Sequence, residues 1–262
     1  MQSSLQRYFL LRINKLFNHL HDFELMGDEP SLHDFRVELK KLKSVIKFLK
    51  TIYPKQKFKK VNHLLGSIFQ NAGEIREYQL LQQWLKKHEL KNIVENYFPE
   101  EKIKSLISSF HQQSASYKTD LQEVIDRCNK YVQITNKILP EQYVTELNAQ
   151  IEKLLHKHLS TKDWHELRKL IKKWMYASNW IVHEEKNKIN SLFSYYNKLQ
   201  ETIGQWHDLL VIKETLHQKQ IHLSAEIDIQ KDLSKALEKL NHAIKYREKQ
   251  VAEIISRQLI TA

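Results

Sequence analysis

Apolar residues recur along most of this chain at the three- and four-residue spacing that is typical of amphipathic helices. The first such segment is residues 2–25, and its apolar stripe consists of Leu5, Phe9, Ile13, Leu16 and Leu20. A loop is expected at 26–30. Ser31 then fits the N-cap of a second helix that runs to about Tyr53, because a serine hydroxyl can accept a hydrogen bond from the first turn.

The same spacing predicts helices through the rest of the chain, with glycines and prolines marking where they stop. Helical pattern resumes at Lys55, is interrupted at 71–73 and continues to about Lys87. The second half shows a similar break at Gly204. Further helices are predicted over 100–139, 140–159, 163–185, 188–203, 206–222 and 226–260.

The composition agrees with a fold made only of helices. The chain of 262 residues contains four Gly and four Pro, which is too few for the turns that connect many short strands. Its hydrophobic fraction of 41% is enough to bury a core. We therefore predict an all-α fold and disfavour sandwiches, barrels and Rossmann-type nucleotide folds.

Two segments of the chain match each other at an offset of 132 residues. The aligned pairs are His33 with His165, Arg36 with Arg168, Lys40 with Lys172 and Lys41 with Lys173. A second match follows, because Gly-Glu-Ile-Arg-Glu at 73–77 and Gly-Gln-Trp-His-Asp at 204–208 lie at nearly equal distances beyond the two histidines. The matches predict two homologous halves, 1–138 and 139–262, each a helical bundle and related by a pseudo-two-fold axis.

The basic residues of the two matched segments fall on one face of each predicted helix. At ~100° per residue, those of the first segment lie within an arc of roughly 80°, away from the apolar face. This first basic stripe consists of His33, Arg36, Lys40, Lys43 and Lys47. The second basic stripe consists of His165, Arg168 and Lys172, with Lys169 and Lys173 at its edge. Like charges at this spacing repel, so the stripes favour a bound anion over a merely solvated face.

The overall charge points in the same direction. Lys and Arg exceed Asp and Glu by 11, and 14 His add charge at lower pH. Such an excess suits a polyanion, whether nucleic acid, anionic membrane or phosphate polymer, and suits an inert basic surface equally. No apolar run is long enough to span a membrane, and the apolar run at the start is too short for a signal peptide. A single cysteine, Cys128, favours a reducing setting, so the cytoplasm is the expected location.

Taken together, the motifs resemble the CHAD family, the conserved histidine α-helical domain. The resemblance rests on His33-x-x-Arg36-x-x-x-Lys40 and its counterpart at 165–172, together with the two glycine segments. It implies two pseudo-symmetric four-helix bundles with a basic central groove or pore, binding of inorganic polyphosphate, and association with polyphosphate granules. The implied contacts are His33, Arg36, Lys40, Lys43, Lys47, Arg76, His165, Arg168, Lys169, Lys172 and Lys173.

The glycine segments have two interpretations. Their acidic residues, Glu77 and Asp208, could pair with the basic stripes and orient them. Alternatively, each glycine closes one helix and the acidic residue stabilises the first turn of the next, which is the interpretation that we prefer here. This chain also departs from the family pattern, since Glu77 stands in place of Asp and His207 in place of Asn.

No catalytic motif is found, so we expect a binding protein without cofactors. The chain lacks a Gly-Lys-Ser/Thr phosphate loop and a His-Glu-x-x-His zinc motif. The His19/His21 and His156/His158 pairs do not share a helix face, which argues against a metal site. RNA binding is the main alternative function, and a helical scaffold without a polyanion ligand is another. The oligomeric state is left open.

Overall fold

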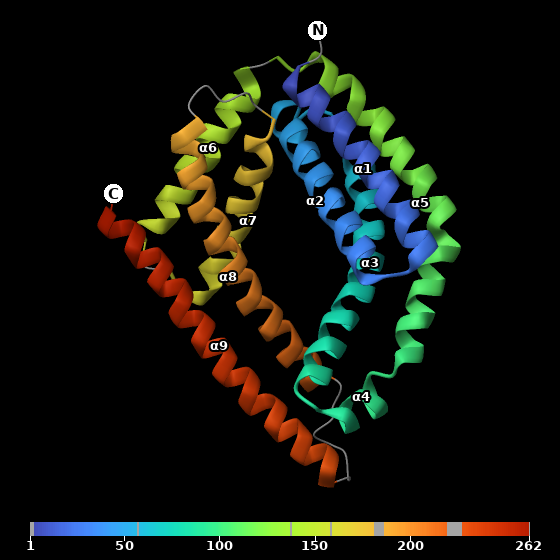
Figure 1. Cartoon of the computed structure of the whole chain (residues 1–262). Helices are drawn as coiled ribbons and strands as arrows, with labels where there is room; N and C mark the ends of the chain where they lie inside the picture. The colour runs from blue at the N-terminus through green and yellow to red at the C-terminus, as the bar shows by residue number, and fades with distance from the viewer. Residues whose placement is uncertain are drawn as a thin grey trace. The chain divides into compact units, whose positions relative to one another are not determined.

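The computed structural model describes residues 3–56, 58–136, 138–157, 159–180, 186–218 and 227–261, with side chains described except at 186–191 and 257–261. Within these ranges helices are the only regular secondary structure, which confirms the all-α prediction (Figure 1). They are α1 (Ser4–Met26), α2 (Glu29–Ile52), α3 (Lys59–Lys87), α4 (Lys91–Tyr97), α5 (Glu100–Ile134), α6 (Ile138–Leu155), α7 (Thr161–Ser178), α8 (Lys186–Gln218) and α9 (Ile227–Thr261).

The first two helices start on side-chain caps. Ser3 and Gln6 form a capping box at the start of α1, in which each side chain bonds the backbone of the other residue. The N-cap of α2 is Asp28, whose carboxylate accepts from the Ser31 backbone N–H, so the prediction of Ser31 as the cap was wrong. The prediction placed Pro30 in the loop before the helix, because proline is common in loops. Proline is tolerated in a first helical turn, where its missing N–H would have no partner.

The two predicted breaks at glycine were also wrong. Gly73 lies inside α3 and Gly204 lies inside α8, and both helices run through without interruption. The interpretation of these glycines as helix ends therefore fails as well. A glycine within a helix costs only about 1 kcal/mol relative to alanine, so a local contact can offset it.

Other helix boundaries differ from the predicted ones by a few residues. The predicted helix at 100–139 ends at Ile134, and the next begins at Ile138 with Pro140 in its first turn. The helix predicted over 163–185 ends at Ser178; residues 181–185 lie outside the described part of the chain, as do 219–222. The short helix α4 was not predicted, because seven residues are too few to show a periodic pattern.

The described residues form two compact units. Unit 1 contains those within 1–80, 100–144 and 176–182, and unit 2 contains those within 81–99, 145–175 and from 183 onward. Each unit contains residues from both sequence halves, 1–138 and 139–262. The last part of α3 and the whole of α4 belong to unit 2, although both come from the first half of the sequence.

In unit 1, α1 packs along α2, and α5 contacts both (Figure 1). The predicted apolar faces form the core, since Leu5, Phe9, Ile13, Leu16 and Leu20 of α1 are all buried. Phe110 of α5 meets Phe23 edge-on, with ring centroids 5.4 Å apart, and also contacts Phe35. The same packing leaves the opposite face of α2, with its basic residues, outside this core.

In unit 2, α8 packs along α9, and α4 packs against α9. Trp164 at the start of α7 meets Trp206 of α8 edge-on, with ring centroids 5.2 Å apart. Trp174 of α7 likewise contacts Tyr196 of α8, and Leu167 and Ile171 of α7 are buried. No helix among the described residues has the length and apolar character needed to cross a membrane.

Candidate functional site

The first basic stripe lies on α2 and faces the neighbouring helix α3 of unit 1. Three of its members, Arg36, Lys40 and Lys43, gather around the ring of Phe69 from α3. The Arg36 guanidinium carbon lies 4.5 Å from the ring centroid, and the Nζ atoms of Lys43 and Lys40 lie 4.6 Å and 5.7 Å from it. His33 and Lys47, the first and last residues of the stripe, are exposed. The structure therefore concentrates positive charge beside one aromatic ring, which we call the Phe69 cluster.

Arg36 is fixed by the backbone of α3. Its Nη1 donates to the carbonyl oxygen of Phe69 at 3.0 Å. A Cβ atom at Gly73 would lie 2.9 Å from the same nitrogen, closer than a real side chain allows. Gly73 thus leaves the space in which the guanidinium sits.

The second basic stripe makes the same contact within unit 2. Arg168 Nε donates to the carbonyl oxygen of Gln200 at 3.2 Å, and a Cβ at Gly204 would lie 2.8 Å from Arg168 Nη2. In both cases the accepting carbonyl belongs to the residue one helical turn before the glycine. Each of the two matched segments therefore makes the same arginine–carbonyl contact within its own unit.

The surroundings of the second stripe differ from those of the first. Gln200 of α8 occupies the position that corresponds to Phe69 of α3. The second stripe therefore has no aromatic ring at this position. Lys169 forms an ion pair with Glu166 at 2.5 Å on the exposed side of α7. Lys173 is half-buried. Lys169, at the edge of the second stripe, thus has a carboxylate partner on its own helix.

Burial and neighbouring charge lower the pKa values of the central lysines. Burial, followed by the positive charge of Arg36, lowers the pKa of Lys43. Burial lowers the pKa of Lys172 to about 8, with Arg168 acting in the same direction and Asp208 and Glu201 opposing it. Both shifts mean that the folded protein holds these ammonium groups at a cost that a nearby anion would reduce.

The two histidines have pKa values below the ordinary value. Partial loss of solvent around the His33 ring, followed by the charge of Arg76, lowers the pKa of its imidazole. Loss of solvent, followed by His207, does the same at His165, and the two rings lie 5.0 Å apart between centroids. In each half the third residue after the motif glycine therefore lies near the motif histidine.

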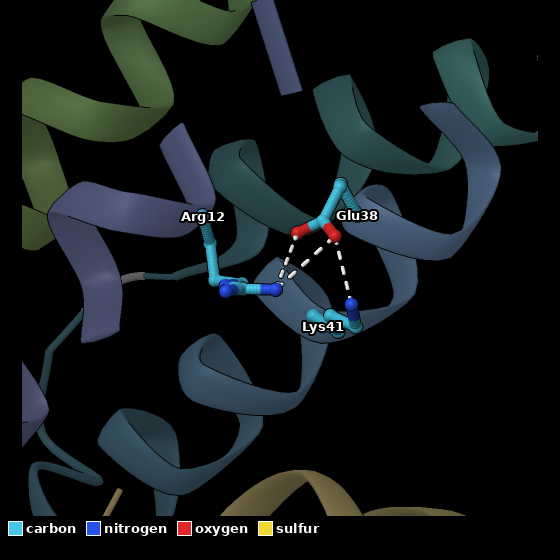
Figure 2. Close-up of polar contacts among 3 residues, drawn as sticks. All are labelled: Arg12, Glu38 and Lys41. Atoms are coloured by element: carbon cyan, nitrogen blue, oxygen red, sulfur yellow. Dashed lines mark hydrogen bonds and ion pairs between the residues drawn. The ribbon is translucent and has the colours of Figure 1, made fainter. Parts of the chain in front are cut away.

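Two further basic residues are held by carboxylates of unit 1. Arg76 forms an ion pair with Glu29 in the first turn of α2. Lys41 points away from the Phe69 cluster and donates to the buried Glu38 at 2.7 Å (Figure 2). Arg12 of α1 donates to both oxygens of the same carboxylate, at 3.2 Å and 3.4 Å (Figure 2). Lys41 thus belongs to a contact between α1 and α2, and not to the first basic stripe.

Sequence reasoning missed Phe69 and His207 as members of the site. A signal for Phe69 was present, because it lies one helical turn before the motif glycine and hence on the same face of the helix. His207 was noted only as a departure from a motif. Among the described residues, no group of three or more His, Cys, Asp or Glu is arranged to hold a metal ion.

The fold and these contacts define an all-helical protein in which two matching helices each present basic side chains beside a glycine-containing helix. Residues 8–217 match the CHAD domain family, and the chain therefore belongs to that family, as its motifs predict.

The fold is also similar to the crystal structure of the CHAD domain from the plant Ricinus communis. The TM-score is 0.64 at 15% sequence identity, and the match covers 96% of this chain and 88% of that chain. At this identity the likeness shows the fold alone. No curated protein matches the chain.

Proposed function

We propose that this protein binds inorganic polyphosphate, without catalysis, through the basic side chains of α2 and α7. The Phe69 cluster is the main observation that supports the proposal. Three cations converge on one ring, although each repels the others and is partly removed from water. An anion placed between them would relieve that repulsion, and a chain of phosphates would do so at successive turns of the helix.

A thin, flexible phosphate chain suits this site better than a nucleic acid. Proteins that bind single-stranded RNA or DNA use aromatic rings as platforms on which bases stack. Here the aromatic ring beside the first basic stripe, Phe69, is already contacted by three cations. The tryptophans Trp174, Trp180 and Trp206 are buried in the cores of their units. These features favour a ligand that consists of phosphate groups alone.

Lysine supplies much of the charge on both stripes, and this determines the kind of binding that we expect. An ammonium group contacts phosphate as a point charge, whereas a guanidinium can form two parallel hydrogen bonds. Much of the affinity should therefore come from release of counterions, as in protein–DNA binding. We further propose that this binding brings the protein to polyphosphate granules in the cytoplasm.

The test is a titration of long-chain polyphosphate into the protein and two variants. The Lys40→Gln/Lys43→Gln variant should bind about tenfold or more weakly, because it loses two phosphate contacts. Lys15→Gln/Lys102→Gln is the matched control, since it removes two charges from exposed lysines elsewhere in unit 1. Equal affinity of the two variants would contradict the proposed site. Release of orthophosphate during incubation with divalent metal would contradict the absence of catalysis.

A further inference from the structure

Two glycines of this chain lie in the middle of long helices, at the points where an arginine from another helix approaches. Gly73 of α3 faces Arg36, and Gly204 of α8 faces Arg168. The nearest arginine nitrogen lies 2.9 Å from the ideal Cβ position in the first case and 2.8 Å in the second. Neither glycine is required by its backbone conformation, since both lie inside regular helices. The reason for each glycine therefore lies in the space that a missing side chain leaves beside the helix.

The arginine uses that space to reach the helix backbone. The accepting carbonyls, at Phe69 and Gln200, lie four residues before the respective glycines. In an α-helix such a carbonyl already accepts from the N–H of the glycine itself. Where the glycine has no side chain, this part of the backbone is uncovered, and the planar guanidinium can lie against it and donate a second hydrogen bond.

Gly66 provides an internal comparison. It lies in the same helix as Gly73, two turns earlier, but an ideal Cβ built there meets nothing within 4 Å. Glycine within a helix is ordinarily less favourable than alanine. At Gly66 an alanine would therefore be accepted without any displacement, whereas at Gly73 it would displace Arg36.

We propose that Gly73 and Gly204 are positioning residues, which dock the guanidiniums of Arg36 and Arg168 on the backbones of α3 and α8 and thereby set the geometry of the two basic stripes. The bond to the carbonyl uses one of the five N–H donors of a guanidinium. The part of this inference that concerns binding rests on the proposed function; the part that concerns docking does not.

A methyl group at position 73 changes the Phe69 cluster through Arg36. The contact atoms are the far end of a flexible side chain, so Arg36 can move without unfolding the protein. Once moved, it loses the bond to the Phe69 carbonyl and its place over the ring. The charge that it contributes beside Lys43 moves with it. The expected result is weaker phosphate binding in a protein that is still folded.

The docking part is tested by denaturant unfolding of Gly66→Ala, Gly73→Ala, Arg36→Ala and the double variant Gly73→Ala/Arg36→Ala. Gly66→Ala should raise the unfolding midpoint, as alanine favours the helix. Gly73→Ala should not raise it in the natural chain but should raise it in the Arg36→Ala background, where the space is empty. If Gly73→Ala raises the midpoint equally in both backgrounds, the proposal is overturned.

Loss of folding is also informative in this design. If Gly73→Ala fails to fold while the double variant folds, the result supports a steric clash between the new methyl group and Arg36. If both fail to fold, the glycine is needed for a reason other than Arg36, and the proposal is overturned. Gly204→Ala and Arg168→Ala repeat the same cycle in unit 2, and the proposal requires the same sign there.

The binding part is tested with long-chain polyphosphate over a range of salt concentrations. Gly73→Ala should weaken binding about fivefold, the loss expected for one hydrogen bond, and lower the slope of log affinity against log salt by about one. A purely structural role would leave that slope unchanged. Gly66→Ala should match the natural protein in both respects, and an unchanged slope for Gly73→Ala would overturn the effect on binding. If the natural protein does not bind polyphosphate at all, the proposed function fails, whereas the unfolding cycle still decides the docking of Arg36.

Discussion

At the scale of single residues, the proposed binding should depend most on lysines whose charged form is destabilised by the fold. Lys43 and Lys172 lie next to arginines of the same helix and are partly buried, and both effects lower their pKa values. Anion binding favours the charged form of each lysine. Binding must therefore be accompanied by proton uptake wherever these groups are partly deprotonated in the free protein.

Lys172 makes this prediction specific. Its pKa is about 8 in the free protein, as the net result of burial, Arg168, Asp208 and Glu201. Raising the pH from 7 to 9 removes its proton, so polyphosphate affinity should fall across this range. Lys172→Arg should reduce the fall, because a guanidinium stays charged at these pH values. Affinity measured by calorimetry at several pH values tests this, and an equal fall in both proteins would contradict it.

The histidines should respond on the acid side. Their lowered pKa values mean that His33 and His165 are mainly neutral at pH 7 and take up protons only below the ordinary histidine value of about 6.5. A bound anion favours the protonated rings, so affinity should rise as the pH falls from 7 to 5.5. His33→Gln/His165→Gln should flatten this rise. A rise of the same size in that variant would exclude both rings from the site.

The sequence shows the residue types at the site better than their contacts. Arg36, Lys40 and Lys43 were correctly placed on one helix face, because helical spacing alone determines which residues share a face. Phe69 lies on a different helix, and the meeting of two helices depends on packing that no local pattern specifies. The role of Gly73 was misread for the same reason, since its partner Arg36 lies far away in the sequence.

At the scale of helices, the buried carboxylate of Glu38 connects α1 to α2. It is 4% exposed, and its oxygens accept from Arg12 and Lys41. Removing one partner of a buried ion pair leaves the others without compensation. The pairing also explains why Lys41, although adjacent to Lys40, does not join the Phe69 cluster.

We expect Glu38→Gln to lower the free energy of unfolding by about 3 kcal/mol, because Arg12 and Lys41 would then lack a counter-charge. Glu74→Gln in α3 is the control, since Glu74 is exposed and its loss should change stability little. Denaturant unfolding of the two variants provides the measurement. Equal stabilities would show that the contact between α1 and α2 does not depend on this carboxylate.

Helix positions were predicted correctly where the apolar spacing was regular. The predictions were wrong where a proline or glycine lies within a helix. The apolar stripe of α1 was predicted correctly, as Leu5, Phe9 and Ile13 are buried. The start of α2 and the continuity of α3 and α8 were not, because Pro30 and the two motif glycines were taken as interruptions. Each such residue is tolerated by a local circumstance, the first turn for the proline and a docked guanidinium for the glycines.

At the scale of the whole molecule, a formal charge of +11 attracts any polyanion, so charge alone does not separate polyphosphate from RNA. Long-range attraction affects every such ligand and weakens for all of them as salt is added. What distinguishes the ligands is the local geometry of the stripes. A decisive measurement therefore needs a competitor that carries the same charge in a different shape.

The most direct test of the central claim is a titration of long-chain polyphosphate at physiological salt, with RNA of matched charge as competitor. We predict tight binding that RNA does not displace, and a clear loss of that binding in Lys40→Gln/Lys43→Gln. Weak binding, or ready displacement of polyphosphate by RNA, would contradict the account and limit membership of the CHAD family to a statement about the fold.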